Sequence, residues 1–312
     1  MRDDVRLAVI GVGHLGQHHA RLLAALDGVD LVGVVDTKPG RAAEVGARYG
    51  VRGVSDSADL PRGSVDAVTI AVPTASHVEV ALRFIDEGVS VLVEKPLAGT
   101  LADADRLLAS AARQGVMLAA GHTERFNPAV VAALPLVVNP RFVEVHRLGT
   151  FPERSLDIDV VFDLMIHDLD LLLAAVKSEV VSVEAVGVSV LTPRTDIANA
   201  RLRFASGCVA NVTASRISRD KVRKIRFFQH DSYVSVDYAA QEVEAYRLVT
   251  KDGRRVIEGG KLDVPREEPL GAELADFVDA VRHGREPGVS GQAGRDALAL
   301  ATRVAEEMAA SQ

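Results

Sequence analysis

Short runs of valine, isoleucine and leucine alternate with amphipathic stretches through the first 120 residues of the chain. Continuous apolar runs separated by helical patterns are typical of parallel strands covered on both faces by helices. The alternation predicts a doubly wound α/β domain of the Rossmann type over residues 1–121. The expected strands are VRLAVI, VDLVGVVD, VDAVTIAV, VSVLVEKP and VMLAAG, and the expected helices cover residues 14–25, 40–49, 76–87 and 101–113.

The pattern changes in residues 122–312. A helix expected at 160–176 is followed by strand-like segments joined by short turns such as ASG, HDS and KDG, which favour a large, mostly antiparallel open sheet in an α+β domain. Two closing helices, near 270–283 and 292–310, are candidates for packing back on the first domain. The expected strands lie near residues 180–190, 198–205, 208–216, 222–229, 232–238, 242–249 and 254–257.

Polar residues interrupt a nearly all-apolar helix in the segment FDLMIHDLDLLL, residues 162–173. At 100° per residue, Asp163, His167 and Asp170 share one stripe, and Asp168 lies off it. A helix that is apolar almost all round is normally buried, and a buried carboxylate needs a partner. We expect Asp168 to face away and to form a helix contact or a salt bridge, whereas Asp170 either supports His167 or belongs to a buried network.

A glycine-rich segment, AVIGVGHLGQHHARLL, places Gly11, Gly13 and Gly16 in the GxGxxG spacing between the first strand and the first helix. The first glycine allows a tight turn, the second lets a pyrophosphate approach the backbone, and the third lets helix and strand pack closely. Asp36 ends the second strand, where a carboxylate can accept hydrogen bonds from an adenosine ribose. The segment therefore predicts a dinucleotide site.

The choice of cofactor depends on Asp36, because a carboxylate at that position repels a 2′-phosphate and favours NAD over NADP. Lys38 and Arg41 lie nearby in DTKPGR and offset part of the repulsion, so NADP remains the alternative. We expect the backbone N–H groups of His14 and Leu15 to bind the pyrophosphate.

Two later strands end in polar residues: AVPTASH supplies Pro73, Thr74 and His77, and VLVEKPLAGT supplies Glu94 and Lys95. In open α/β sheets, ligands lie beyond the carboxyl ends of the strands, so these residues are predicted to face the nicotinamide half of the cofactor. An isolated Glu-Lys-Pro tripeptide would usually be a surface turn. Its place directly after a buried strand favours the functional interpretation.

Composition narrows the possible partners. A net charge of -7 and a pI near 5.7 argue against a nucleic-acid binder, and 4% aromatic residues without tryptophan leave little for base stacking. The single cysteine, Cys208, allows no intramolecular disulfide and favours a cytoplasmic setting. The N-terminal MRDDVRLAVIGVG does not resemble a signal peptide, and no apolar run is long enough to predict a membrane span.

Five motifs occur in a fixed order: AVIGVGHLGQHHA, AVPTASH, VLVEKPLAGT, GHTERFNPAV and DLMIHDLDLLL. Together they resemble the Gfo/Idh/MocA family of NAD(P)-dependent oxidoreductases, strongly from residue 5 to about 175, and the remainder of the chain is compatible with it. The resemblance implies that Lys95, Asp163 and His167 form the catalytic set. It also implies a homodimer or homotetramer assembled through the open face of the second sheet.

Oxidation of a secondary alcohol requires removal of the hydroxyl proton while a hydride passes to nicotinamide. His167 suits the first task, because an unperturbed histidine has a pKa of about 6.5. Lys95 would stabilise charge on the reacting oxygen, and Asp163 either orients the imidazole or binds a substrate hydroxyl. Two alternatives stand beside this hypothesis: His167 as a satisfied core residue, and a metal site of Asp163, His167 and Asp170, which lacks a second histidine. No metal is predicted.

Several residues are candidates for substrate contact. Arg125 and Asn127 in GHTERFNPAV could contact cofactor or substrate, and an interdomain salt bridge is an equal alternative for Arg125. Arg154, together with Arg147 and Arg216, could bind a diphosphate, because guanidinium groups bind phosphates bidentately.

Within the family, HTERFNPAV and FDLMIHDLDLLL look most like the branch that oxidises UDP-N-acetylglucosamine to its 3-keto sugar for lipid A or surface-polysaccharide synthesis. The expected substrate is therefore a small nucleotide-sugar. The alternatives are a free-sugar or inositol dehydrogenase of the same family, and a catalytically silent NAD-binding sensor, since a fold does not determine a function.

Overall fold

The computed structural model describes residues 4–61, 63–151 and 158–310 of the chain. The chain divides into two compact units: the first comprises Met1–Thr123 and Glu268–Leu298, and the second comprises Glu124–Glu267 and Ala299–Gln312. The main boundary lies two residues beyond the one expected at 121, and the closing segment is shared between the units. No helix within the described ranges has the length and apolar character needed to cross a bilayer.

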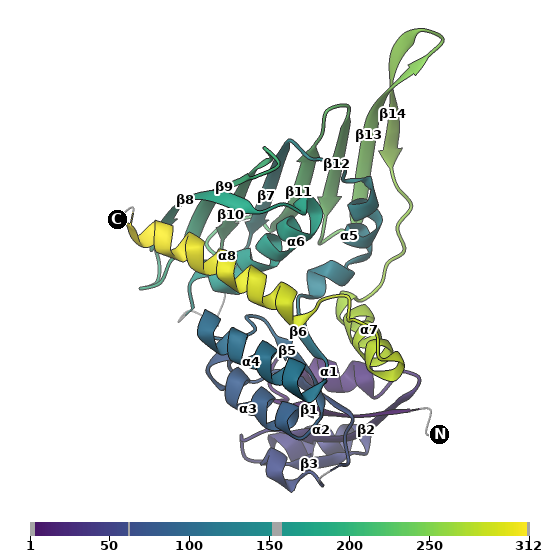
Figure 1. The fold of residues 1–312 in the computed structure, drawn as a ribbon, viewed down its shortest axis with the longest axis vertical. Coiled ribbons are helices and arrows are strands. Elements are labelled where there is room, and N and C mark those ends of the chain that lie inside the picture. The colour runs from purple at the N-terminus through teal and green to yellow at the C-terminus, as the bar shows by residue number, and fades with distance from the viewer. Residues whose placement is uncertain (1–3, 62, 152–157, 311–312) are drawn as a thin grey trace. The chain divides into compact units, whose positions relative to one another are not determined.

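The first unit is a doubly wound α/β domain, as predicted (Figure 1). Its six strands are all parallel and lie in the order β3-β2-β1-β4-β5-β6. The strand order therefore runs one way from β1 to β3 and the other way from β4 to β6. Sheets of this type bind ligands at the switch point between β1 and β4. The strands are β1 (Val5–Ile10), β2 (Val29–Val35), β3 (Arg52–Val54), β4 (Ala67–Ile70), β5 (Ser90–Glu94) and β6 (Leu118–Gly121). The helices between them are α1 (Gly16–Leu23), α2 (Arg41–Tyr49), α3 (Thr74–Asp86) and α4 (Leu101–Gln114).

Both faces of this sheet are buried. Consecutive residues of β1, Leu7, Ala8 and Val9, point to opposite faces, yet all three are inaccessible to solvent. Helix α7 (Pro269–His283) contributes Leu274 and Phe277 to the same apolar cluster. The closing part of the chain therefore completes the core of the first unit.

The second unit contains an eight-stranded sheet in the order β14-β13-β12-β11-β7-β10-β9-β8. All neighbours are antiparallel except β7 and β10, which confirms the predicted mostly antiparallel sheet. Figure 1 shows α5 (Pro128–Ala133) and α6 (Ile166–Val176) on the same side of it. The strands are β7 (Phe142–Leu148), β8 (Val180–Val188), β9 (Ile197–Phe204), β10 (Val209–Ser215), β11 (Val222–Phe228), β12 (Ser232–Asp237), β13 (Glu242–Lys251) and β14 (Arg254–Lys261).

Strand β7 was not predicted from the sequence, although it lies between β11 and β10 near the middle of the sheet. Val143 and Val145 are buried at alternate positions, which is the pattern of a strand covered on one face. Arg147 continues the buried face and is also buried. A charged residue at a core position conceals the alternation, and its partner is described below. Helix α8 (Gly291–Ala310) closes the described chain.

Candidate active site

The glycine-rich loop joins β1 to α1 in the first unit. Gly11 has a φ of 85°, and a Cβ atom there would come within 2.8 Å of the carbonyl oxygen of Ala71. A Cβ on Gly16 would collide with the carbonyl oxygen of Gly11, whereas a Cβ on Gly13 would meet no atom within 4 Å. The first and third glycines are therefore needed for packing, and the second leaves the backbone open to a ligand.

Two hollows adjoin this loop, with volumes of about 480 Å³ and about 440 Å³. Gly13 and Asp36 line both of them. The larger hollow is also lined by apolar residues, among them Val35, Val72 and Val80. Hollows at the switch point of a doubly wound sheet, next to an open glycine backbone, fit the adenosine and pyrophosphate of a dinucleotide. The larger hollow is also lined by Gly11, Ser55, Asp56, Ser57, Pro73 and Arg83, and the smaller one by His14, Gln17, Lys38, Arg41 and Glu44.

Asp36 is held in place by the backbone. Its carboxylate accepts hydrogen bonds from the N–H groups of Val12 at 3.0 Å and Lys38 at 2.9 Å. The guanidinium of Arg41 donates to the carbonyl oxygen of Val12 at 2.8 Å and to Glu44 at 2.9 Å. Arg41 is thus held beside the glycine loop, where Glu44 pairs with its guanidinium.

Glu94 ends β5 and is almost fully buried. One carboxylate oxygen lies 3.0 Å from Nε2 of His19, which is completely buried in α1. A Cβ on Gly121 of β6 would come within 2.9 Å of the same carboxylate, so glycine leaves the space that Glu94 occupies. Glu94 was predicted to contact the cofactor. Its carboxylate connects β5 to α1, and the predicted cofactor contact stays a prediction.

His77 has a comparable role. It was predicted to lie near the nicotinamide. It is buried in α3, and its two ring nitrogens each lie 2.9 Å from a carbonyl oxygen, of Val72 and of Pro96. Burial lowers the pKa of His77, and the two carbonyl contacts oppose this shift. His77 thereby connects the end of β4 to the turn that contains Lys95. Pro73 lines the larger hollow, and Thr74 begins α3.

In the second unit, the helix expected over residues 160–176 is not a regular α-helix. A π-helical turn, Val161–Met165 (η4), precedes α6. Asp163 lies in η4, and His167 is the second residue of α6. Both side chains are half-buried. Single π-helical turns inside α-helices are rare and occur frequently at functional sites, so this irregularity marks the segment on structural grounds.

The other two acids of this helix form bidentate ion pairs. Asp168 accepts hydrogen bonds from Nε and Nη2 of Arg147 at 2.7 and 2.9 Å, and Asp170 accepts them from Nε and Nη2 of Arg125 at 2.7 and 3.0 Å. Both carboxylates are buried. The expected salt bridge of Asp168 is confirmed, and Arg125 forms its ion pair inside the second unit, not between domains.

A wider network surrounds Arg147. It also pairs with Glu124 at 3.1 Å, and its guanidinium lies 5.3 Å from the ring centroid of Tyr238. Burial alone would lower the pKa of Arg147, but the charges of Asp168 and Glu124 raise it well above its ordinary value. Arg147 is fully used by these contacts, so the prediction that it binds a diphosphate is not supported.

Asn127 and Arg154 were further candidates for substrate contact. Asn127 is buried, caps α5 by accepting the N–H of Ala129 at 3.1 Å, and donates to the carbonyl oxygen of Tyr238 at 3.0 Å. These contacts give it a structural role at the start of α5. Arg154 lies outside the described residues.

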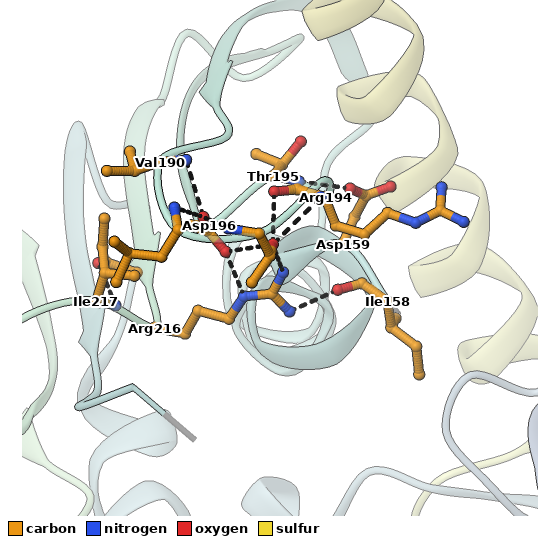
Figure 2. Close-up of polar contacts among 11 residues, drawn as sticks. Ile158, Asp159, Val190, Arg194, Thr195, Asp196, Arg216 and Ile217 are labelled. Carbon is orange, nitrogen blue, oxygen red and sulfur yellow. Dashed lines mark hydrogen bonds and ion pairs between the residues drawn. The ribbon is translucent and has the colours of Figure 1, made fainter. Parts of the chain in front are cut away.

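Arg216, the third arginine considered for a diphosphate, is buried against Asp196 (Figure 2). Asp196 also accepts hydrogen bonds from the backbone N–H groups of Val190, Leu191 and Thr192 and from the Thr192 hydroxyl. Burial would raise the pKa of Asp196, but the hydrogen bonds from Thr192, Leu191 and Arg216 outweigh it and hold the pKa well below its usual range. The sequence shows where an arginine lies but not which carboxylate it meets, so this pair was missed.

Comparison with known proteins places the fold in a family. Residues 5–122 match the model of the Gfo/Idh/MocA oxidoreductase family with its NAD-binding Rossmann fold, and residues 141–230 match the Gfo/Idh/MocA C-terminal domain. The chain is 40% identical over 303 residues to UDP-N-acetylglucosamine 3-dehydrogenase of Acidithiobacillus ferrooxidans, with 96% of each chain covered. The chain belongs to the Gfo/Idh/MocA oxidoreductase family.

A solved structure and a second relative agree with this assignment. A solved structure of the Acidithiobacillus ferrooxidans enzyme superposes on this Gfo/Idh/MocA chain with a TM-score of 0.92 over 98% of both. The scyllo-inositol 2-dehydrogenase (NAD(+)) of Bacillus subtilis is 29% identical over 314 residues, covering 92% of this chain and 89% of that one. Membership confirms the resemblance inferred from the five motifs and assigns the first unit as a nicotinamide-dinucleotide domain.

Replacement of Asp168 by alanine should lower the free energy of unfolding by about 3–5 kcal/mol, because it leaves the guanidinium of Arg147 buried without its main partner. Equilibrium urea unfolding measures this. Glu258→Ala is the control: it removes the partner of the exposed Arg247 and Lys251 on the β13–β14 hairpin and should cost no more than about 1 kcal/mol. Equal losses in the two variants would contradict the assignment of Asp168 as a buried anchor.

The depressed pKa of Asp196 predicts a pH dependence of stability. Because the folded-state pKa lies below the unfolded value of about 3.9, this carboxylate stabilises the fold above that pH, and its contribution is lost as the pH falls through the folded-state pKa. Asp196→Asn should therefore destabilise the protein at neutral pH, and the difference from wild type should shrink below about pH 4. Urea unfolding at a series of pH values measures it; a difference independent of pH would contradict the prediction.

Proposed function

We propose that this protein is a NAD-dependent dehydrogenase that oxidises the 3-hydroxyl of UDP-N-acetylglucosamine to the 3-keto sugar. The observation that carries the proposal is 40% identity, over 96% of both chains, to an enzyme named for that substrate and position. A cytoplasmic location, a role in lipid A or surface-polysaccharide synthesis, and assembly as a homodimer or homotetramer belong to the same proposal.

The catalytic set in this proposal is Lys95, Asp163 and His167. Support comes from the way the second unit uses its ionisable residues: Asp168 and Asp170 are buried in arginine pairs, whereas Asp163 and His167 stay half-buried around the π-helical turn. A polar side chain that keeps partial access to solvent, beside acids that are buried in ion pairs, is a candidate for contact with a substrate. Lys95 follows the buried Glu94 and is also half-buried.

Each residue has a defined task. His167 accepts the proton of the 3-hydroxyl, for which an ordinary histidine pKa of about 6.5 is well suited. Lys95 donates a hydrogen bond to the reacting oxygen and stabilises the negative charge that develops on it. Asp163 orients the imidazole or binds a neighbouring hydroxyl of the sugar. The bound nicotinamide supplies the hydride acceptor.

The second candidate is an inositol or free-sugar dehydrogenase, which the Bacillus subtilis relative favours at a lower identity of 29%. The same three residues would serve it, because the chemistry at the reacting hydroxyl is unchanged. Only the rest of the substrate differs. A catalytically silent NAD-binding sensor is the least favoured function, since Lys95, Asp163 and His167 are all present.

Purified protein should reduce NAD when UDP-N-acetylglucosamine is supplied, as measured by the absorbance of NADH. His167→Gln and Lys95→Met should each lower kcat by a factor of about 10²–10⁴, the range expected for loss of a general base or a charge-stabilising donor. His230→Gln is the control, because it replaces an exposed histidine of the same unit in the β11–β12 turn.

Three results would contradict this assignment: turnover of myo-inositol but not of the nucleotide-sugar, unchanged kcat in both catalytic variants, or an equal loss in the control. Turnover of myo-inositol alone would favour the inositol candidate. Unchanged kcat in both variants, or an equal loss in the control, would show that the assigned residues are not catalytic.

Asp36→Ser should raise the ratio of kcat/KM for NADP to that for NAD by about tenfold or more. Two unit charges about 4 Å apart repel by roughly 1–4 kcal/mol in water or near a protein surface, and the substitution removes that repulsion. Steady-state kinetics with both cofactors measures the ratio. Asp27→Asn removes an equal charge from the surface of the same unit, in the turn before β2 and therefore at the other end of that strand from Asp36, and should leave the ratio unchanged. A ratio that stays at the wild-type value in Asp36→Ser would show that Asp36 does not select the cofactor.

A further inference from the structure

The polar cluster around Asp196 joins three segments of the second unit that are far apart in the sequence (Figure 2). They are the loop between β8 and β9, the residue after β10, and the residues that lead into η4. The loop wraps around the Asp196 carboxylate, and Arg216 bridges the carboxylate to the third segment. The cluster is therefore connected to the start of the helix that carries Asp163 and His167.

Three hydrogen bonds make this connection. Nη1 of Arg216 donates to the carbonyl oxygen of Ile158 at 2.6 Å. The backbone N–H of Thr195 donates to the carboxylate of Asp159 at 2.8 Å, and the N–H of Val160 donates to the carbonyl oxygen of Thr195 at 3.1 Å. The three residues before η4 are thus all held by the β8–β9 loop or by Arg216.

Asp159 connects these hydrogen bonds to the π-helical turn η4. Its carbonyl oxygen accepts the N–H groups of Phe162 and Asp163, both at 3.1 Å, in the first turn of η4. The side chain of Asp159 is fixed by the loop, and its main chain is fixed to the π-helical turn. A displacement of the loop would therefore move the backbone of Asp163 directly.

Thr192 completes the cluster by bridging both charged groups. Its hydroxyl lies 2.7 Å from a carboxylate oxygen of Asp196, to which it donates, and accepts from Nη2 of Arg216 at 2.9 Å. The ion pair of Arg216 and Asp196 is 2.9 Å long and completely enclosed. With both partners oriented by the same hydroxyl, the guanidinium has one geometry in which to reach Ile158.

The sheet does not require this cluster for its own pairing. Strands β9 and β10 are already in register over their full length, from Val209 opposite Arg203 to Ser215 opposite Ile197. A buried ion pair is moreover weak evidence for stability, because desolvation opposes the attraction between the charges. A π-helical turn, in contrast, is a rare geometry that persists where its surroundings hold it.

We propose that Asp196, Arg216 and Thr192 are positioning residues that fix the start of η4 and so place Asp163 and His167 for the reaction. They act through Ile158 and Asp159. The inference rests on the proposed function in one respect, the assignment of His167 as the general base.

The test compares full-length Thr192→Val and Arg216→Lys with wild type. Thr192→Val removes only the bridging hydroxyl, and Arg216→Lys keeps the charge but cannot reach both Ile158 and Thr192. We expect kcat with UDP-N-acetylglucosamine to fall about tenfold and about 100-fold, respectively, because small misplacements of reacting groups are that costly. The Kd for NAD, measured on the same preparations, should stay unchanged, because its hollows lie in the first unit.

The matched control is Thr213→Val. Thr213 is a partly buried threonine of β10 whose hydroxyl accepts a hydrogen bond from Asn199 and takes no part in the cluster around Asp196. It should lower kcat by less than about twofold. Amide hydrogen exchange gives a readout that does not depend on the substrate: peptides that cover residues 158–167 should exchange about tenfold faster in Thr192→Val than in wild type or in Thr213→Val.

The proposal is wrong if Thr192→Val lowers the melting temperature but leaves both kcat and the exchange of residues 158–167 at the control values, because the cluster then stabilises the fold alone. If wild type does not oxidise the nucleotide-sugar, the proposed function fails, and the exchange comparison still decides whether the cluster holds η4. If Arg216→Lys does not fold, the comparison of Thr192→Val with wild type and with Thr213→Val decides the proposal.

Discussion

The ion pair between Asp168 and Arg147 ties α6 to β7, near the middle of the eight-stranded sheet, and the arrangement of the second unit follows from it. Both groups are withdrawn from water, and such charges are tolerated only when the pairing is close and further hydrogen bonds complete it. The bidentate geometry, with Glu124 as a second partner of Arg147, meets that condition. The pairing fixes α6 in rotation as well as in position, because a fork of two hydrogen bonds has one orientation.

The rotation of α6 about its axis determines which of its polar residues are buried. Asp168 and Asp170 are turned into buried arginine pairs, and His167, which is adjacent to Asp168 in the sequence, is turned to a half-buried position. The π-helical turn then sets Asp163 relative to His167 in a way that a regular α-helix would not. The ion pairs that anchor the helix therefore also determine that its candidate catalytic residues stay half-buried.

Local features of the sequence predicted most of the fold. The glycine spacing and the alternation of apolar runs with helical patterns depend on neighbours within a few residues, so the doubly wound domain and the glycine loop were predicted correctly, and Asp36 lies beside that loop as expected. Contacts between distant residues were not accessible in the same way. His19 and Glu94 are 75 residues apart, and nothing near Glu94 indicates that a buried histidine will meet its carboxylate. Strand β7 was missed for the same reason, since the partner of Arg147 lies on another element.

Two of the five motifs that carried the family resemblance have a common arrangement of buried and half-buried residues. At the end of β5, Glu94 is buried and Lys95 is half-buried, and at the start of α6 His167 is half-buried and Asp168 is buried. Successive residues of a strand point to opposite faces, and successive residues of a helix are separated by about 100°. A supporting residue and a reacting residue can therefore be adjacent in the sequence while they face different surroundings. A motif read from sequence thus combines two kinds of residue, and burial and hydrogen-bond partners separate them: Glu94 and Asp168 are buried against His19 and Arg147, whereas Lys95 and His167, the proposed catalytic residues, are half-buried beside them.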